Sequence, residues 1–390
     1  MSPYPKIFLA MDNSFAAKRW TEPDEWARVI RDLGVTCVEA SADTEADPFY
    51  CGEEYLQGWV NKVLAAQATH GVRVANFYTG YSTYRTLGLG HPSSVIRKRV
   101  MDGWLKPMAR TVARLKAGLG FYLHAFEEAA LQDPARYAVA LETLYAELAE
   151  ISRYAGEIGP VPIVVEQMYT PHQVPWTIPG GCDYIREVTQ RSGFPASIAL
   201  DTGHSTGQQR FLRPARDAVE KALTGQAPVP YLGSDSAYAA FDAACGTSRS
   251  GLSNAGASIE KEMDRFPHMF SSPSDCSLYA WLEDLGGYSR IVHLQQTNGK
   301  SSGHLPFTEE NNEMGIVHPG KVLEALARCY QKEPRPGMPE RCPEIYLTFE
   351  IFPHTTDRPR EILPPLAESV RYWRTWIPED AVSLDALLTR

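Results

Sequence analysis

The stretch ASIALD (196–201) decides both the predicted fold and the predicted site, because five small or apolar residues lead directly to a carboxylate. Three other stretches have the same form: VPIVVE (161–166), SRIVHL (289–294) and EIYLTFE (344–350). Short apolar runs of this length indicate buried strands. A carboxylate or imidazole at the end of such a strand adds nothing to a core. The polar residue at the end of each run is explained if each strand places one polar side chain at the open end of a barrel, where the active sites of (β/α)8 enzymes lie.

Four earlier apolar runs complete a set of eight strands, and helical segments alternate with them. The predicted strands are 6–11, 35–40, 72–77 and 120–126, and the predicted helices are 21–34, 55–71, 93–118 and 133–159. This alternation favours βαβ units with parallel pairing. Eight strands favour a closed barrel over an open doubly wound sheet, and no GxGxxG follows the first strand. We therefore predict an α/β protein with one (β/α)8 TIM-barrel domain over residues 1–390.

The spacing of the polar strand ends predicts one long insertion. The 35-residue interval from Glu166 to Asp201 fits one βα unit, whereas the 92-residue interval from Asp201 to His293 is too long for one. The excess, 205–274, contains one plausible helix at 213–225 and then a stretch rich in Gly, Ser, Ala and Pro. We predict an insertion after the sixth strand that acts as a lid, with a disordered excursion as the alternative.

Composition and charge exclude several classes of protein. The 390 residues are 44% hydrophobic and 22% charged, which is typical of a soluble globular protein. The net charge of −9 is the opposite of the positive charge expected of a protein that binds nucleic acid. The seven cysteines are scattered, odd in number and without a CxxC pair, so we expect free thiols and a cytoplasmic location. The amino-terminal sequence has no long apolar segment, and we expect no membrane span.

The four polar strand ends, Glu166, Asp201, His293 and Glu350, form a candidate metal site. Each has an ordinary explanation when taken alone, because a carboxylate can pair with an arginine or cap a helix and a histidine can be structural. The argument rests on the predicted location that all four share. Two Glu, one Asp and one His form a hard, oxygen-rich set that suits Mn²⁺, Mg²⁺ or Co²⁺ better than a structural zinc.

The order of these residues resembles a known family. A strand-end Glu, then LDTGH (200–204), then a strand with a terminal His and a final-strand Glu is similar to the xylose isomerase-like TIM barrels. Within them it resembles the sugar epimerase and isomerase branch that includes the D-tagatose 3-epimerases and hydroxypyruvate isomerases. The resemblance covers the eight strands and leaves out 205–274. It implies four metal ligands and several roles: Glu166, Asp201, His293 and Glu350 bind the metal, Glu166 and Glu350 also transfer a proton on opposite faces of the substrate, and His204 hydrogen-bonds a substrate oxygen.

The chain also departs from the tagatose epimerase pattern. Those enzymes carry a second Glu six residues after the first, where this chain has His172. They carry an Arg six residues after the metal-binding His, where this chain has Gly299 followed by Lys300. The metal set is therefore retained, while the substrate-contacting set, and with it the identity of the substrate, is open.

Further substrate-binding candidates follow the predicted strands, and each also has an ordinary explanation as loop packing. They are His124 and Asn76 at the ends of the fourth and third strands, Trp176 and Tyr169 as an apolar wall, and Lys300 and His304 as ligands for hydroxyls or a phosphate.

The resemblance predicts a divalent-metal-dependent 3-epimerase or isomerase of a ketose or ketose phosphate, in which two carboxylates transfer a proton through an enediolate. A metal-dependent lyase on the same barrel, of the inosose dehydratase or C-glycoside-cleaving type, is the alternative. An endonuclease IV-like phosphodiesterase is disfavoured, because no Asp-x-His pair occurs in 295–307 and the chain is acidic. A barrel kept only for binding would be expected to lose a ligand. The expected partner is a small sugar or sugar phosphate, with no nucleic acid or membrane, and a homo-oligomer is compatible with such a barrel.

Overall fold

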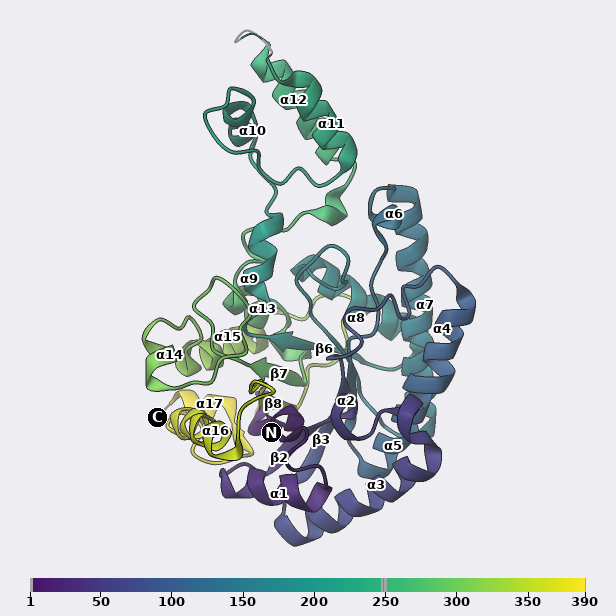
Figure 1. The fold of residues 1–390 in the computed structure, drawn as a ribbon, viewed down its shortest axis with the longest axis vertical. Coiled ribbons are helices and arrows are strands. Elements are labelled where there is room, and N and C mark those ends of the chain that lie inside the picture. The colour runs from purple at the N-terminus through teal and green to yellow at the C-terminus, as the bar shows by residue number, and fades with distance from the viewer. Residues whose placement is uncertain (1–2, 247, 249–250, 390) are drawn as a thin grey trace.

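The computed structural model describes residues 3–246, 248 and 251–389, and its centre is a closed parallel barrel (Figure 1). The barrel strands are β1 (Lys6–Asp12), β2 (Cys37–Ser41), β3 (Arg73–Thr79), β4 (Gly118–Phe121), β5 (Ile163–Glu166), β6 (Ala196–Asp201), β7 (Ile291–Leu294) and β8 (Glu344–Phe349). Each strand pairs in parallel with the next one along the chain, and β1 pairs with both β2 and β8, which closes the ring. The predicted eight-stranded α/β barrel is confirmed.

Helices follow every strand and surround the barrel (Figure 1). Strand β1 is followed by η1 (Asn13–Ala16) and α1 (Pro23–Asp32), and β2 is followed by α2 (Ala42–Glu45) and α3 (Pro48–His70). Strand β3 is followed by α4 (Ser94–Val100), η2 (Met101–Leu105) and α5 (Lys106–Leu115), and β4 is followed by α6 (Glu128–Leu131) and α7 (Pro134–Ile158). After β5, β7 and β8 they are α8 (Ile178–Ser192), α14 (Glu309–Glu313) and α15 (Pro319–Gln331), and α16 (Pro359–Arg374). A short strand β9 (Val382–Ser383) then pairs antiparallel with β1 and leads into α17 (Leu384–Leu388).

The alternation of side chains along each strand divides the core into two parts. One set points outward and packs beneath the helices, for example Ile7, Leu9 and Met11 of β1. The other set fills the barrel interior: Phe8, Ala10, Cys37, Ala75, Val164, Ala199, Ile291 and Tyr346. The interior is therefore packed with apolar residues below its open end, and the next inward-facing residue of each strand lies at that end.

Two predicted elements differ from the structure. The fourth strand spans Gly118–Phe121 rather than 120–126, because the chain leaves the barrel after Phe121 and pairs with the preceding loop through a bridge between Gly88 and His124. The helix predicted over 93–118 is interrupted by the π-helical turn η2 (Met101–Leu105). An unbroken apolar period of about 3.6 residues hides such an interruption.

The segment between β6 and β7 has more helices than the sequence predicted. It contains α9 (Ser205–Gln208), η3 (Gln209–Phe211), α10 (Arg216–Leu223), α11 (Asp235–Ala244), α12 (Leu252–Met263), η4 (Pro267–Met269), α13 (Leu278–Leu285) and η5 (Gly286–Tyr288). Helix α10 corresponds to the predicted helix 213–225, whereas α11 and α12 were not predicted from their small residues. Helices α10, α11 and α12 project beyond the barrel (Figure 1). The base of the projection is held by a β-bridge between Leu212 and Ser271.

Within residues 3–246, 248 and 251–389, no helix has the length and apolar character needed to cross a membrane. All seven cysteines are free thiols.

Candidate active site

Strand geometry explains how the four candidate ligands come together. Val164, Ala199 and Ile291 point into the barrel interior. Because side chains alternate with a period of two, the residue two positions later points inward one layer closer to the carboxyl end. Those residues are Glu166, Asp201 and His293. The register places Asp201 directly beside His293 on the neighbouring strand.

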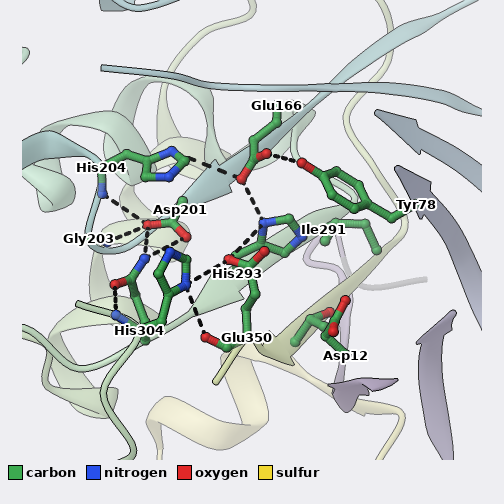
Figure 2. Close-up of polar contacts among 12 residues, drawn as sticks. Asp12, Tyr78, Glu166, Asp201, Gly203, His204, Ile291, His293, His304 and Glu350 are labelled. Atoms are coloured by element: carbon green, nitrogen blue, oxygen red, sulfur yellow. Dashed lines mark hydrogen bonds and ion pairs between the residues drawn. The ribbon is translucent and has the colours of Figure 1, made fainter. Parts of the chain in front are cut away.

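Glu350 completes the set from the position just after β8. Its backbone N–H donates to the carbonyl of Leu294 at 3.0 Å, which continues the pairing of β8 with β7 by one residue. One ligand-type atom from each of Glu166, Asp201, His293 and Glu350 lies within 4.8 Å of the others, and all four residues are buried. Figure 2 shows these side chains pointing toward one another from β5, β6, β7 and the end of β8. The sequence prediction that these four residues share one location is confirmed.

The charge of this cluster fits a divalent cation. Three buried carboxylates lie together, and within the described residues none has a Lys or Arg partner; their ion pairs are with histidines. The Oε2 atom of Glu350 is buried without a hydrogen-bond donor. The histidines offset part of the negative charge, and a cation held by the carboxylate oxygens would offset the rest. The donor set of three carboxylates and one imidazole is therefore suited to a divalent metal.

The second nitrogen of the His293 ring supports this interpretation. Nδ1 of His293 lies 2.9 Å from Oε1 of Glu166, and Nε2 lies 2.8 Å from Oε2 of Glu39. A metal-binding histidine usually gives its other ring N–H to a carboxylate or carbonyl, which fixes the orientation of the ring. Asn76 in turn donates to Oε1 of Glu39 at 2.6 Å. Glu39 and Asn76 thus hold His293 in place from inside the barrel.

The turn LDTGH fixes Asp201. Oδ1 of Asp201 accepts hydrogen bonds from the backbone N–H groups of Gly203 and His204 at 2.6 and 2.9 Å. The amide of Gln295 donates to both carboxylate oxygens, at 2.8 and 2.9 Å. Burial opposes ionisation, but the charges of His204, His304 and His293 and the Gln295 hydrogen bond together hold the pKa of Asp201 below its usual range. Asp201 is therefore fixed and ionised, as an oxygen ligand for a cation would need to be.

The two glutamates have different electrostatic surroundings. Burial alone would raise the pKa of Glu166, but the charge and hydrogen bond of His293 outweigh it and lower the pKa. The Tyr78 hydroxyl also donates to Oε2 of Glu166. Burial raises the pKa of Glu350, and His293 and His304 offset only part of that effect. Glu166 is thus the more strongly stabilised anion, and Glu350 is the more basic carboxylate.

A cavity of about 420 Å³ opens onto the cluster. Its lining combines strand-end residues with residues of the loops that follow the strands: Tyr78, Gly80, Tyr81, Tyr84, Glu166, Met168, Tyr169, His204, Ser302, His304, Glu350 and Phe352. The ring of His304 stacks on Phe352 with centroids 4.1 Å apart. Nδ1 of His304 lies 3.4 Å from Oε2 of Glu350. Carboxylates, imidazoles and aromatic faces around a small polar volume are suited to a ligand of sugar size.

The predicted substrate-binding residues divide into two groups. His204, His304 and Tyr169 line the cavity. Of the others, Asn76 is fully buried against Glu39, and His124 is fully buried with Nε2 2.5 Å from the carbonyl of Val174.

Trp176 and Lys300 also lie outside the cavity lining. Trp176 is buried against Phe211. Lys300 is exposed in the loop after β7. These placements give no support to a direct contact with a substrate in the cavity.

Sequence reasoning missed Tyr78, Tyr81 and Asp12. Asp12 is buried at the end of β1, paired in register with Glu39, and Figure 2 shows it beside Glu350. The alternation of side chains along β1 could have identified Asp12, because it follows the inward-facing Ala10 by two residues and therefore also points inward. The two tyrosines carried no comparable signal, because an aromatic residue near a strand end is most often part of the core.

A closed (β/α)8 barrel with this ligand set at the carboxyl ends of its strands defines a TIM-barrel enzyme with a metal-type centre. No family model matches the chain. A curated relative, D-erythrulose 1-phosphate 3-epimerase of Brucella abortus (strain 2308), is 23% identical over 383 residues, which cover 97% of this chain and 99% of the relative.

Solved structures share the fold over nearly the whole chain. A putative xylose isomerase from Rhodospirillum rubrum ATCC 11170 has a TM-score of 0.67 at 17% identity, covering 95% of this chain and 99% of that one. D-psicose 3-epimerase from Clostridium cellulolyticum H10, with D-tagatose, has a TM-score of 0.50 at 13% identity, covering 98% and 95%. The 3-keto-D-glucoside 4-epimerase from E. coli has a TM-score of 0.52 at 13% identity, covering 94% and 99%. The chain is thus similar in sequence to a curated sugar-phosphate epimerase and similar in fold to these solved structures.

Proposed function

We propose that this protein is a divalent-metal-dependent 3-epimerase of a ketose phosphate. The observation that carries the proposal is the pair Glu166 and Glu350, which lie in one buried cluster with Asp201 and His293 and open onto one cavity. The relative named as a D-erythrulose 1-phosphate 3-epimerase matches the chain over nearly its full length and supports the choice of reaction and of a phosphorylated substrate.

The four ligands are proposed to be Glu166, Asp201, His293 and Glu350, with Mn²⁺ as the preferred ion and Mg²⁺ or Co²⁺ as substitutes. A divalent cation held there would stabilise the negative charge that develops on the carbonyl and adjacent hydroxyl oxygens of the substrate. Asp201 and His293 serve as ligands only, because their remaining polar atoms are held by Gln295 and Glu39.

Glu166 and Glu350 are proposed to transfer the proton at C3. A C3 proton next to a carbonyl is too weakly acidic for a carboxylate in water, so abstraction depends on stabilisation of the enediolate. One glutamate, in its ionised form, removes the proton, and the other, protonated from solvent, gives its proton to the same carbon from the opposite face, which inverts C3. Exchange of both carboxyl groups with solvent then restores the starting protonation state. Abstraction at C1 with return of the proton to C2 would instead give an aldose–ketose isomerase. His204 and His304 line the same cavity and are proposed to hydrogen-bond the substrate oxygens.

We further propose that α10–α12 form an insertion after β6 within a single barrel domain. A lid role for 205–274 stays a prediction, because the cavity lining contains no described residue of that segment. The seven free thiols support a reducing, cytoplasmic location.

Deuterium incorporation tests the proposed reaction. Metal-stripped protein in D2O is incubated with four- to six-carbon ketose phosphates, with and without Mn²⁺, and the products are followed by NMR. The proposal predicts metal-dependent label at C3 together with the inverted configuration. Label at C2 of an aldose product, or at C1 of the recovered ketose, would instead establish an isomerase. Metal-dependent loss of water or of another leaving group, without label at C3, would replace the epimerase with a lyase.

A further inference from the structure

The cavity has a second polar group, Tyr84, Arg85 and Tyr169, that the proposed proton transfer does not use. Tyr84 and Tyr169 line the cavity from the loops after β3 and β5. Nε of Arg85 donates to the Tyr84 hydroxyl at 2.7 Å, and the guanidinium carbon lies 5.2 Å from the centroid of the Tyr84 ring. The charge of Arg85 therefore lies beside the mouth of the cavity.

Arg85 also acts on the other tyrosine. Burial raises the pKa of Tyr169, as do Tyr84, Glu166 and Asp201, whereas the positive charge of Arg85 lowers it. The two phenols and the guanidinium are thus close enough to interact. The Tyr84 oxygen accepts from Arg85, which leaves its own proton free to donate to a ligand.

Arg85 has no carboxylate partner among residues 3–246, 248 and 251–389, and its side chain is exposed. Arg97, twelve residues later in α4, shows the usual arrangement, since its Nε lies 2.9 Å from Oε1 of Glu147. An arginine without a counterion beside a polar cavity keeps its terminal N–H donors available. Their planar fork matches two oxygens of a phosphate.

The loop that carries Arg85 is held against the end of β4. The backbone N–H of Leu89 donates to the carbonyl of Leu123 at 2.9 Å, and the N–H of Ala125 donates to the carbonyl of Leu87 at 3.1 Å. Gly88 has φ of +46°, and a Cβ there would lie 2.0 Å from the carbonyl oxygen of Leu123. Only glycine permits this close approach. The loop thus presents Tyr84 and Arg85 in a fixed position, which reduces the entropy lost when a ligand binds.

We propose that Arg85 is the specificity-determining residue that binds the phosphate group of the substrate, with the hydroxyls of Tyr84 and Tyr169 as additional donors. This inference rests on the proposed function. It places the phosphate end of a ketose phosphate at the mouth of the cavity, beside Arg85, and the reacting carbons at Glu166 and Glu350. Lys300, which the sequence suggested for a phosphate, is exposed and outside the cavity lining, as Arg85 is. Arg85 differs because it donates to the lining residue Tyr84, whereas no side-chain contact joins Lys300 to a lining residue in the described part of the chain.

Equilibrium binding tests Arg85 without requiring turnover. The Mn²⁺-loaded protein is titrated by calorimetry with dihydroxyacetone phosphate, with dihydroxyacetone and with inorganic phosphate. The variants are Arg85→Gln, Lys300→Gln and, as a matched control on the outer helix α16, Arg371→Gln. Because a hydrogen-bonded charge pair is lost, Arg85→Gln should weaken binding of dihydroxyacetone phosphate by about 10- to 100-fold. Binding of dihydroxyacetone should change less than about twofold, and Lys300→Gln and Arg371→Gln should bind as the wild type does.

Unchanged binding of dihydroxyacetone phosphate by Arg85→Gln would overturn the inference. A loss of affinity seen only in Lys300→Gln would also overturn it, as would a wild-type protein that binds dihydroxyacetone as tightly as dihydroxyacetone phosphate. The proposed function fails separately. If the phosphate preference depends on Arg85 but no ketose phosphate is labelled at C3, Arg85 is still the phosphate-binding residue and the reaction is not an epimerisation. If free ketoses are epimerised as well as their phosphates and Arg85→Gln has no effect, the reaction stands and the phosphate assignment is wrong.

Discussion

The ends of the barrel strands and the loops above them differ in how their side chains are positioned. Glu166, Asp201 and His293 are each fixed by strand register and by the alternation of side chains, so their locations follow from β-sheet geometry. Tyr84, Tyr169 and His304 lie in loops, and their locations depend on particular glycines, turns and ring contacts. The comparison suggests that reaction chemistry is held by the strands and substrate choice by the loops, as is general for this fold.

The largest effect on turnover is expected at a strand end. Glu350→Gln removes one of the two proposed proton-transfer groups and should lower kcat for epimerisation by about 10²- to 10⁴-fold. The matched control is Glu344→Gln at the opposite end of β8, where the carboxylate accepts from the Tyr346 hydroxyl at 2.7 Å. Steady-state kinetics and thermal unfolding of both variants check this. Activity of Glu350→Gln near that of the wild type would show that one carboxylate suffices.

The next effect concerns the metal. Asp201→Asn replaces a proposed charged oxygen ligand. Loss of a residue that only supports a metal ligand typically weakens metal binding by about 10- to 100-fold, so loss of the ligand itself should weaken Mn²⁺ binding by more than that. Asp183→Asn on α8, where the carboxylate is exposed and paired with Arg186, is the control. Calorimetric titration of the stripped proteins measures both affinities. An unchanged affinity in Asp201→Asn would remove Asp201 from the metal site.

A smaller effect is expected from a residue that orients a glutamate. Tyr78→Phe removes the hydroxyl that donates to Glu166 and should lower kcat by about 10-fold, as expected for a hydrogen bond to a charged group. Tyr122→Phe is the matched control, because the Tyr122 hydroxyl is buried without a hydrogen-bond partner in the described part of the chain. If Tyr78 positions Glu166, Tyr78→Phe should also change the pH profile of kcat, whereas Tyr122→Phe should not. Equal effects of the two variants would contradict a role for the hydroxyl.

The smallest effect on turnover is expected from Asp12→Asn, which should instead change the pH dependence of stability. Burial, with the charges of Glu39 and Glu350, raises the pKa of Asp12 from 3.8 to about 7. The folded state therefore favours the protonated form, and metal-free wild-type protein loses stability as the pH rises from about 4 to about 7. Asp12→Asn should lack this part of the loss and gain stability relative to the wild type above pH 7. Thermal unfolding at pH 5 and pH 8 measures the difference, and a variant that is equally destabilised at both would refute the assignment.

The same contrast explains what the sequence could predict. The eight strands and the shared location of the four candidate ligands were predictable, because each apolar run ends in a polar residue that points into the barrel, as in VPIVVE. Asp12 and Glu39 follow the same pattern and were within reach of the same reasoning. The predicted position of His124 at a strand end was wrong, because β4 ends at Phe121 and His124 is buried in the following loop against the carbonyl of Val174. Arg85 gave no signal in the sequence, because its position depends on the approach of Gly88 to Leu123, a contact between separate segments.

The central claim is that the four strand-end side chains form one divalent metal site. Its most direct test is the anomalous diffraction of crystals of the protein loaded with Mn²⁺, measured at the manganese absorption edge. The account predicts a single strong anomalous peak per chain, in contact with Glu166, Asp201, His293 and Glu350. A peak elsewhere, or no peak in protein that is folded and saturated with Mn²⁺, would contradict it.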